Sequence, residues 1–479
     1  MVSKKVAAIA VIVLVMVTFV YLEQGFRNEE PSKNAIFGKE NPYVKEYALS
    51  ANSAPNGLTV DKGGIVWVAS KNGILFSLDP KTGQINSHEI KSGAVQYGNL
   101  YANSTMVWTI IQDGDGKIWF SPLGTRSIWE FDPTSGNFDS SPVHGSPFQM
   151  KVGENKEIWF TTLSGNTIGV VEKSQGHDYK ISSFDTRNNT IPAGIFLQND
   201  SVWIAGIGSQ NISQYKINRE NNSVKNISMI QNIPKDNSTL FSSPTDVLVN
   251  KNIVWLTEHG TSFLTSYDLD NDKITRYPTS QNYFHTTTLP FWIRGSEDPK
   301  VLWFNEHQGN KIGCFDIYNK TLTEYSIPSL PKDGYLTYSL NISQDPKDEK
   351  ILWFSEWNTD KVAVINGHIP IPFEINSNTK KITLDSSKTD DVIDLEIQSN
   401  MHQSGVVSLN ASSSITSTAE LGNLTARFSS DMADLSHYSK IQLFLHNGGV
   451  PPGNYTVGIS ASDGFVTKTE FLNLSILNR

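Results

Sequence analysis

Residues 301–328 read VLWFNEHQGNKIGCFDIYNKTLTEYSIP and contain three short runs rich in strand-forming residues. The first run carries Trp303, the second ends at Asp316 and the third carries Tyr325. Polar residues that favour turns separate the runs, and a further apolar run begins at Pro290. The segment therefore predicts one antiparallel sheet of four short strands.

The tryptophan-containing run occurs seven times in the chain. The seven tryptophans are Trp67, Trp119, Trp159, Trp203, Trp255, Trp303 and Trp353. Consecutive copies are separated by as few as 40 residues (Trp119 to Trp159) and as many as 52 (Trp67 to Trp119). Repeats of this length with four short strands each are typical of β-propeller blades. The sequence predicts an all-β chain with a seven-bladed propeller over residues 43–370, whose tryptophans pack between neighbouring blades.

The segment YVKEYALS, which begins at Tyr43, resembles the last strand of a blade but has no blade before it. Blade seven runs from about Tyr335 to Asn366 and needs an outer strand. We expect the N-terminal segment to supply it, because ring closure removes exposed strand edges. Cys314 is the only cysteine, so an intrachain disulfide is excluded.

Residues 371–479 break the repeat, because tryptophan is absent and Ser, Thr and Asn are abundant. Alternating runs, such as VIDLEIQ from Val392 and NYTVGISAS from Asn454, predict about seven strands. We predict an immunoglobulin-like β-sandwich here. This domain contains no cluster of histidines or paired carboxylates that would indicate chemistry.

Residues 6–22 form an apolar run that follows Lys4 and Lys5. The run is at the short end for a transmembrane helix, so a secretory signal peptide is the alternative, although no small-x-small cleavage site follows it. We predict a cytoplasmic stub (1–5), a single-pass signal anchor (6–22) and a linker (23–42). The positive charge before the anchor places the rest of the chain outside the cytoplasm.

The charge pattern argues against nucleic-acid binding, because the net charge is -9 and no basic stripe is present. Acceptor sequences for N-glycosylation all lie beyond the predicted anchor, which agrees with an exterior glycoprotein. Chance occurrence in a chain rich in Asn, Ser and Thr accounts for some of them. They are Asn103, Asn188, Asn199, Asn211, Asn221, Asn226, Asn237, Asn319, Asn341, Asn410, Asn423, Asn454 and Asn473.

Three consecutive blades carry a glutamate three residues after the tryptophan: Glu258, Glu306 and Glu356. Equivalent positions of a propeller lie at one height around the axis, so these carboxylates are candidate ligands of a magnesium or calcium ion. The alternative is that each glutamate caps a turn and pairs with a lysine, such as Lys311 or Lys361.

His259 and His307 directly follow two of these glutamates, and His285 lies in the connection that enters blade six. These three histidines are candidate general bases, because imidazole exchanges protons near neutral pH. The alternative is that they are ordinary loop histidines, since neighbouring residues of a strand point to opposite faces.

Residues 301–328, with WFNE, GNKIG and TEYSIP, resemble the blade repeat of the virginiamycin B lyases, and the likeness extends over about residues 43–368. The resemblance implies a seven-bladed propeller that uses magnesium and a histidine base to open a cyclic depsipeptide by elimination. It also implies that the base histidines follow a proline before the first strand of a blade. At those positions this chain has Asn56, Phe148, Ala193, Thr245 and Phe291, and blades two and seven have no alignable proline.

Two functions remain open from the sequence. The first is a membrane-anchored module that binds a small molecule or a surface partner, which the missing base histidines favour. The second is a metal-dependent lyase or lactone-opening enzyme acting at the axial mouth, which the glutamates and nearby histidines favour.

Overall fold

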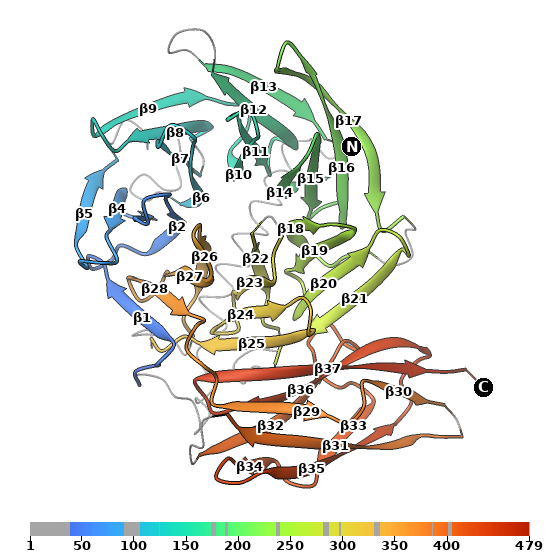
Figure 1. Cartoon of the computed structure of the whole chain (residues 1–479). Coiled ribbons are helices and arrows are strands. Elements are labelled where there is room, and N and C mark those ends of the chain that lie inside the picture. Colours follow the sequence, from blue (N-terminus) through green and yellow to red (C-terminus); the bar gives the residue numbers. More distant parts are fainter. Residues whose placement is uncertain are drawn as a thin grey trace.

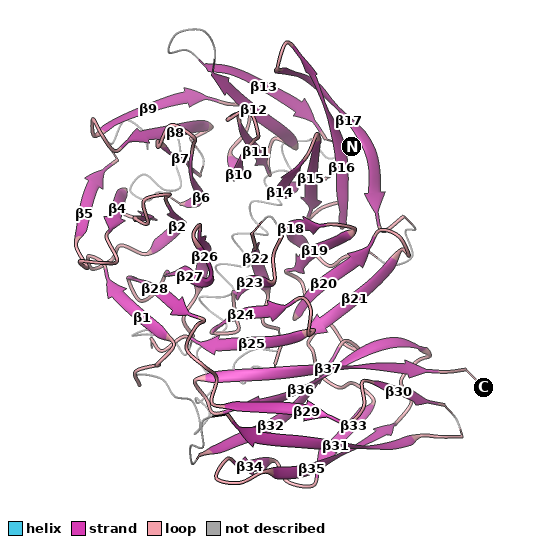
Figure 2. Ribbon diagram, in the orientation of Figure 1, coloured by secondary structure: helices cyan, strands magenta, loops and turns pink. Residues whose placement is uncertain are grey.

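The computed structural model describes residues 39–90, 106–123, 125–173, 179–186, 190–235, 240–280, 287–296, 298–329, 336–385, 387–400 and 405–478. These residues form strands, turns and loops, and Figure 2 shows no helix among them. The predicted anchor at residues 6–22 and His285 lie outside the described residues. Within the described ranges, no helix is long and apolar enough to cross a membrane.

Seven inner strands stand in a ring around a common axis (Figure 1). Each contacts the inner strand of the next blade, and the last contacts the first, so the ring is closed. The inner strands are β2 (Pro55–Val60), β6 (Val107–Gln112), β10 (Pro147–Val152), β14 (Pro192–Gln198), β18 (Pro244–Asn250), β22 (Pro290–Arg294) and β26 (Ser339–Asp345).

Three further antiparallel strands extend each inner strand outward, which makes seven four-stranded blades. The second strands are β3 (Val66–Ser70), β7 (Ile118–Pro122), β11 (Ile158–Thr162), β15 (Ser201–Gly206), β19 (Ile253–Glu258), β23 (Val301–Glu306) and β27 (Asp348–Glu356). The third strands are β4 (Ile74–Leu78), β8 (Ser127–Asp132), β12 (Thr167–Lys173), β16 (Asn211–Glu220), β20 (Phe263–Asp268), β24 (Lys311–Asp316) and β28 (Lys361–Asn366). The outer strands are β5 (Ile85–Glu89), β9 (Asn137–Pro142), β13 (Tyr179–Asp185), β17 (Ser223–Ile233), β21 (Lys273–Pro278), β25 (Thr321–Ser326) and β1 (Val44–Ala48).

The N-terminal strand closes the ring as predicted. β1 pairs with β28 from Val44 opposite Ile365 to Ala48 opposite Lys361, and so forms the outer edge of blade seven. Tyr47 packs its ring 5.6 Å from that of Trp353, which adds an apolar contact to the hydrogen bonds. Two distant parts of the sequence therefore hold blade seven together without a disulfide.

The seven repeat tryptophans are structural, because each is at most 5% exposed. Each shares a core with the next blade: Trp67 packs with Val107 and Ile110 of β6, and Trp353 packs with Leu58 of β2. The expectation that tryptophan fills the space between blades is confirmed. Burial of such large side chains is the main source of stability in a propeller of this kind.

The C-terminal strands form two sheets that share one apolar core. One sheet has the order β29-β31-β35-β33, and the other runs β37-β36-β32-β34 with β30 parallel to β37. Leu395 and Leu443 of the first sheet and Val457 and Leu472 of the second belong to the same core. These strands are β29 (Phe373–Ser377), β30 (Lys381–Leu384), β31 (Asp390–Ser399), β32 (Val406–Ser413), β33 (Leu424–Phe428), β34 (Met432–Asp434), β35 (Ser439–Asn447), β36 (Gly453–Ser462) and β37 (Val466–Ile476).

The sandwich is joined to blade six through a continuous sheet. β37 pairs antiparallel with β25, from Thr321 opposite Glu470 to Tyr325 opposite Val466, and Figure 1 shows the two strands side by side. Phe471 adds an apolar contact, with its ring 5.3 Å from that of Tyr277 in blade five. The edge of blade six is therefore covered, and the two domains form a single sheet at this point.

Candidate functional site

Every inner strand has the same irregularity just after its first residue. In each blade the pairing with the second strand shifts register there, which is a β-bulge. The bulge aligns all seven blades, including blades two and seven, which lack the proline. The first residues of the inner strands are Pro55, Val107, Pro147, Pro192, Pro244, Pro290 and Ser339.

The residues after these first residues, here called the second-position residues, close one end of the axis. They are Asn56, Trp108, Phe148, Ala193, Thr245, Phe291 and Leu340, and all are buried. The Trp108 ring of blade two lies 5.9 Å from the Phe291 ring of blade six, and Phe148 of blade three lies 5.2 Å from Trp108. Because blade six neighbours neither blade two nor blade three, the contacts of Phe291 with Trp108 and Phe148 run across the axis.

Hydrogen bonds between blades hold the second-position residues in place. Thr257 donates to the carbonyl of Phe291 at 2.6 Å, and Ser355 donates to that of Asn56 at 3.1 Å. Both donors lie two residues after the repeat tryptophan of the preceding blade. The same side chain position thus links one blade to the next.

His259 and His307 pack against this aromatic group. Their rings are stacked with centroids 5.4 Å apart, and the Phe291 ring lies 4.8 Å from His259 and 5.2 Å from His307. Burial lowers the pKa of His259 to about 4. Burial, with a smaller effect of His259, lowers the pKa of His307 to about 3. The structure thus brings together two of the three predicted histidines: His307 is buried and His259 is partly buried, and the lowered pKa values favour the neutral form of both rings.

Glu258 is held by groups of its own protein. It is almost fully buried and receives hydrogen bonds from Arg276 Nε at 2.7 Å, Thr265 Oγ1 at 2.6 Å and the Ser242 backbone N–H at 2.8 Å. The guanidinium neutralises the carboxylate, and the backbone contact fixes the connection that enters blade five. This glutamate acts as a bridge between strands.

Glu306 and Glu356 each lie beside a second carboxyl. Burial, reinforced by the charge of Glu324, raises the pKa of Glu306 well above its usual value. Burial, reinforced by Glu46, raises the pKa of Glu356 to about 8. Thr359 donates to Glu356 at 2.7 Å, in keeping with a turn cap.

The two lysines named as partners lie near the second carboxyls. Lys361 Nζ lies 2.6 Å from Glu46, and Lys311 Nζ lies 3.8 Å from Glu324. The alternative stated from the sequence was a glutamate that caps a turn and pairs with a lysine. In these two blades the lysine lies nearest the second carboxyl, Glu46 or Glu324, and not nearest the predicted glutamate.

These three glutamates do not fit a single hard cation. A shared ion needs several free anionic oxygens at about 2.0 to 2.6 Å, whereas Glu258 already accepts hydrogen bonds from Arg276, Thr265 and the Ser242 N–H. Among the described residues, no group of three or more His, Cys, Asp or Glu side chains is arranged to hold a metal ion.

Beneath the aromatic layer, the next residues of the inner strands form a polar layer around Asp246 (1% exposed). Its carboxylate accepts hydrogen bonds from Gln149 Nε2 at 2.9 Å, Arg294 Nη1 at 2.7 Å, and the backbone N–H groups of Val247 and Ile293 at 2.9 and 3.0 Å. Gln149 comes from blade three, Asp246 from blade five and Arg294 from blade six. One buried carboxylate thus ties three blades together, and four donors satisfy it.

The opposite end of the axis contains an open cavity of about 230 Å³. Its walls are the later residues of inner strands β2, β6, β10, β22 and β26, together with the residue that follows β22. Its charged lining residues are Lys151 and Arg294. The full lining is Leu58, Thr59, Thr109, Ile110, Ile111, Met150, Lys151, Arg294, Gly295, Ile342, Ser343 and Gln344.

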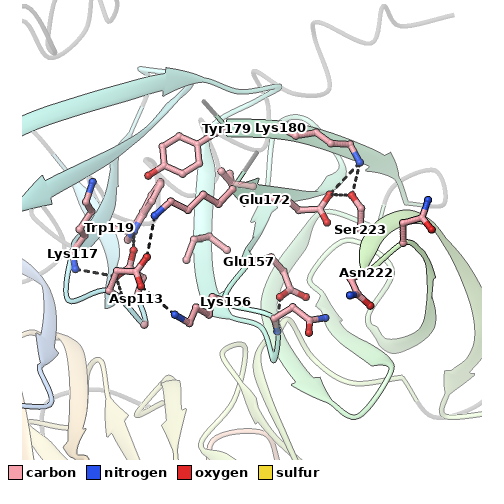
Figure 3. A pocket seen from close by; sticks show the side chains of 17 residues that line it. Asp113, Lys117, Trp119, Lys156, Glu157, Glu172, Tyr179, Lys180, Asn222 and Ser223 are labelled. Atoms are coloured by element: carbon pink, nitrogen blue, oxygen red, sulfur yellow. Dashed lines mark hydrogen bonds and ion pairs between the residues drawn. The ribbon is translucent and has the colours of Figure 1, made fainter. Parts of the chain in front are cut away.

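A larger cavity of about 670 Å³ lies between blades two, three and four (Figure 3). Its charges neutralise one another: Lys156 and Lys173 bind Asp115 at 3.1 and 3.2 Å, and Lys180 binds Glu172 at 3.3 Å. Figure 3 shows the pair of Lys180 and Glu172 at one side of the groove. The groove therefore presents a balanced surface with no excess of either charge.

Sequence reasoning missed the second-position residues of blades two and seven and the whole polar layer. Counting back from the repeat tryptophan would have found the residue of blade two, because Val107 precedes Trp119 by 12 residues, as Pro147 precedes Trp159. The count fails for blade seven, where Ser339 precedes Trp353 by 14 residues. Lys151 and Arg294 are both the fifth residue of their inner strands and lie opposite the repeat tryptophan, but the other blades have no basic residue there, so the repeat gives no signal for this pair or for Asp246. Only the ring brings them together.

No protein-family model matches the chain, and no curated protein matches it. Several solved structures, in contrast, are similar to the propeller. A streptogramin B lyase structure aligns with a TM-score of 0.53 and 22% identity, over 68% of this chain and 97% of that one. The propeller has the fold of these lyases. A catalytically inactive histidine-to-alanine variant of virginiamycin B lyase from Staphylococcus aureus, with quinupristin, aligns with a TM-score of 0.52 and 22% identity over 67% and 98%.

Other propellers share the fold at lower identity. A hydrazine synthase from Kuenenia stuttgartiensis aligns with a TM-score of 0.50 and 12% identity, covering 67% of this chain and 97% of that one. At such identities the likeness shows the propeller and carries no activity with it.

Proposed function

We propose that the chain is a ligand- or partner-binding propeller, held on the outer side of a membrane by residues 6–22. The observation that carries the proposal is the closed second-position end of the axis. The resemblance implies base histidines at these positions in the lyases, whereas this chain has Trp108, Phe148 and Phe291, which pack against one another there. Among the described residues, these aromatic side chains occupy the positions at which the resemblance would place the bases, which supports a role in binding.

The C-terminal domain supports the role of a surface module. We propose that it is an immunoglobulin-type sandwich, because the sheet orders β29-β31-β35-β33 and β32-β36-β37 correspond to the ABED and CFG sheets of that fold. Acceptor asparagines such as Asn319 and Asn454 would carry glycans on the exterior. Asn341 would not, since it is 1% exposed and lies inside the propeller.

A lyase is the second candidate, and one observation favours it. His259 and His307 come from adjacent blades and stack at the same end of the axis, 5.4 Å apart. A movement that exposed them would create a pair of neighbouring imidazoles at this end of the axis.

Turnover distinguishes the two functions. The full chain is incubated with cyclic depsipeptides and lactones, with magnesium, calcium or a chelator. The binding proposal predicts no metal-dependent ring opening. Magnesium-dependent opening that is lost in His307→Gln and retained in His368→Gln, a half-exposed histidine that binds Asp348, would overturn it.

Protease protection in sealed vesicles tests the orientation, since the propeller should be digested only from the outer side.

A further inference from the structure

The cavity at the open end of the axis has an unbalanced charge. Lys151 and Arg294 both line it, and within the described residues Lys151 forms no ion pair. Asp246 is the nearby carboxylate, and its oxygens are already occupied by Gln149, Arg294 and two backbone N–H groups. The cavity therefore has an excess of positive charge, in a chain whose net charge is -9.

The arrangement of Lys151 is unfavourable without a further partner. Burial, together with the positive charge of Arg294, lowers the pKa of Lys151 to about 8, and Asp246 only partly offsets this. A chain does not gain stability by placing two cations side by side. An electrostatic cost of this kind is typical of sites that bind a ligand of opposite charge.

Arg294 is held in a defined orientation. Its Nη1 donates to Asp246 at 2.7 Å and to the Ile293 carbonyl at 2.7 Å, and its guanidinium lies 5.3 Å above the Trp292 ring. A guanidinium fixed on one side presents its remaining N–H groups in a fork that matches a carboxylate or phosphate. Ser343 offers a further donor, because its Oγ accepts from the Val60 N–H at 3.1 Å and its own proton is available.

The size of the cavity limits the ligand. At about 30 Å³ per molecule, 230 Å³ corresponds to roughly eight waters, which is below the usual range of drug-sized pockets. Leu58, Ile110 and Ile342 form apolar parts of the wall, and Lys151 and Arg294 are its charged residues. We propose that this axial cavity binds a small oxyanion, a carboxylate, sulfate or phosphate group, between Lys151 and Arg294. The inference is independent of whether the opposite end of the axis catalyses a reaction.

Calorimetric titration of the full chain at pH 7 tests the site with sulfate, inorganic phosphate and acetate, with chloride at matched ionic strength as the reference. We expect saturable binding of at least one oxyanion. Lys151→Met should weaken it by roughly tenfold or more, because a charge-assisted hydrogen bond is lost. Lys62→Met, which removes an exposed lysine of the propeller that does not line the cavity, is the control and should leave the oxyanion affinity unchanged.

The pH dependence provides the second readout, with sulfate as the probe because its charge is constant between pH 7 and 9. The charged groups that face Lys151 are Arg294 of β22 and Asp246 of β18, so the lysine itself should titrate. Affinity should fall as the pH rises through about 8, and this fall should be absent in Lys151→Met. Binding that is equal in wild type and Lys151→Met, or no saturable binding of any of the three anions, would overturn the proposal.

Discussion

The two ends of the propeller axis are built by the same seven strands and have opposite chemistry. At the second-position end, Trp108, Phe148 and Phe291 close the axis and the neighbouring histidines are neutral. At the other end, Lys151 and Arg294 line an open cavity. Both ends are therefore built from the same inner strands: the second-position residues in the bulge close one end, and residues a few positions later line the cavity at the other. One set of strands can therefore close the axis at one end and line a charged cavity at the other.

The closed end is the more important for stability. Trp108→Ala should lower the free energy of unfolding by about 4 kcal/mol, because it removes a buried aromatic side chain that packs across the axis. Denaturant unfolding measures the change. Tyr318→Ala is the control, since Tyr318 is 72% exposed and its loss should cost little. A loss below about 1 kcal/mol for Trp108→Ala would show that the end is not packed as described.

Arg276→Met tests whether Glu258 is a structural bridge or a metal ligand. The substitution leaves a buried carboxylate without its counter-charge and should cost about 3 kcal/mol. Arg427→Met, in the sandwich, serves as the control. If Glu258 were instead a cation ligand, magnesium or calcium would restore the lost stability. The account predicts that neither ion does so.

The buried histidines predict a specific pH dependence. Their folded pKa values, about 4 and about 3, lie below the unfolded value of about 6.5, so the unfolded chain binds more protons as the pH falls. Stability from these groups is therefore present above pH 6.5 and lost on acidification, on the order of 2 kcal/mol for each histidine between pH 7 and 5.

Glu306 and Glu356 act with the opposite sign, since their folded pKa values are raised and their contribution falls as the pH rises. The histidine effect is therefore read as the difference between wild type and His259→Gln/His307→Gln, measured by denaturant unfolding at both pH values. A double variant with the same pH dependence as wild type would contradict the buried state of these rings.

The smallest effect is expected at the open end. Lys151→Met should leave stability unchanged or raise it by less than about 1 kcal/mol at pH 7, because it removes a poorly compensated cation beside Arg294. Thermal unfolding without oxyanions provides the measurement. A clear destabilisation would mean that Lys151 is a structural residue of the axis.

The sequence predicted the fold well because its signals are local and repeated. Trp303 and its six counterparts set the number of blades, and YVKEYALS from Tyr43 indicated the closure that β1 and β28 make. The junction between β25 and β37 could not be predicted, because nothing in either strand specifies a partner more than a hundred residues away.

The candidate site was harder to predict than the fold. Glu258, Glu306 and Glu356 lie at equivalent positions, yet their roles depend on outer-strand residues that differ between blades: Arg276, Glu324 and Glu46. Burial, which neutralises His259 and His307, is likewise a property of the assembled ring. The sequence therefore showed which glutamates and histidines occupy these positions, but it did not show whether each of them is charged.

The most direct test of the account is the titration of the two buried histidines. Imidazole resonances of the full chain, assigned through His259→Gln and His307→Gln, are followed by NMR from pH 8 to pH 5. We expect neither ring to titrate in this range, because both pack against Phe291 and the pKa values of both are lowered to about 4 and about 3. Titration of either ring near its ordinary pKa of about 6.5 would show a solvent-accessible base, and would contradict the closed end on which the account rests.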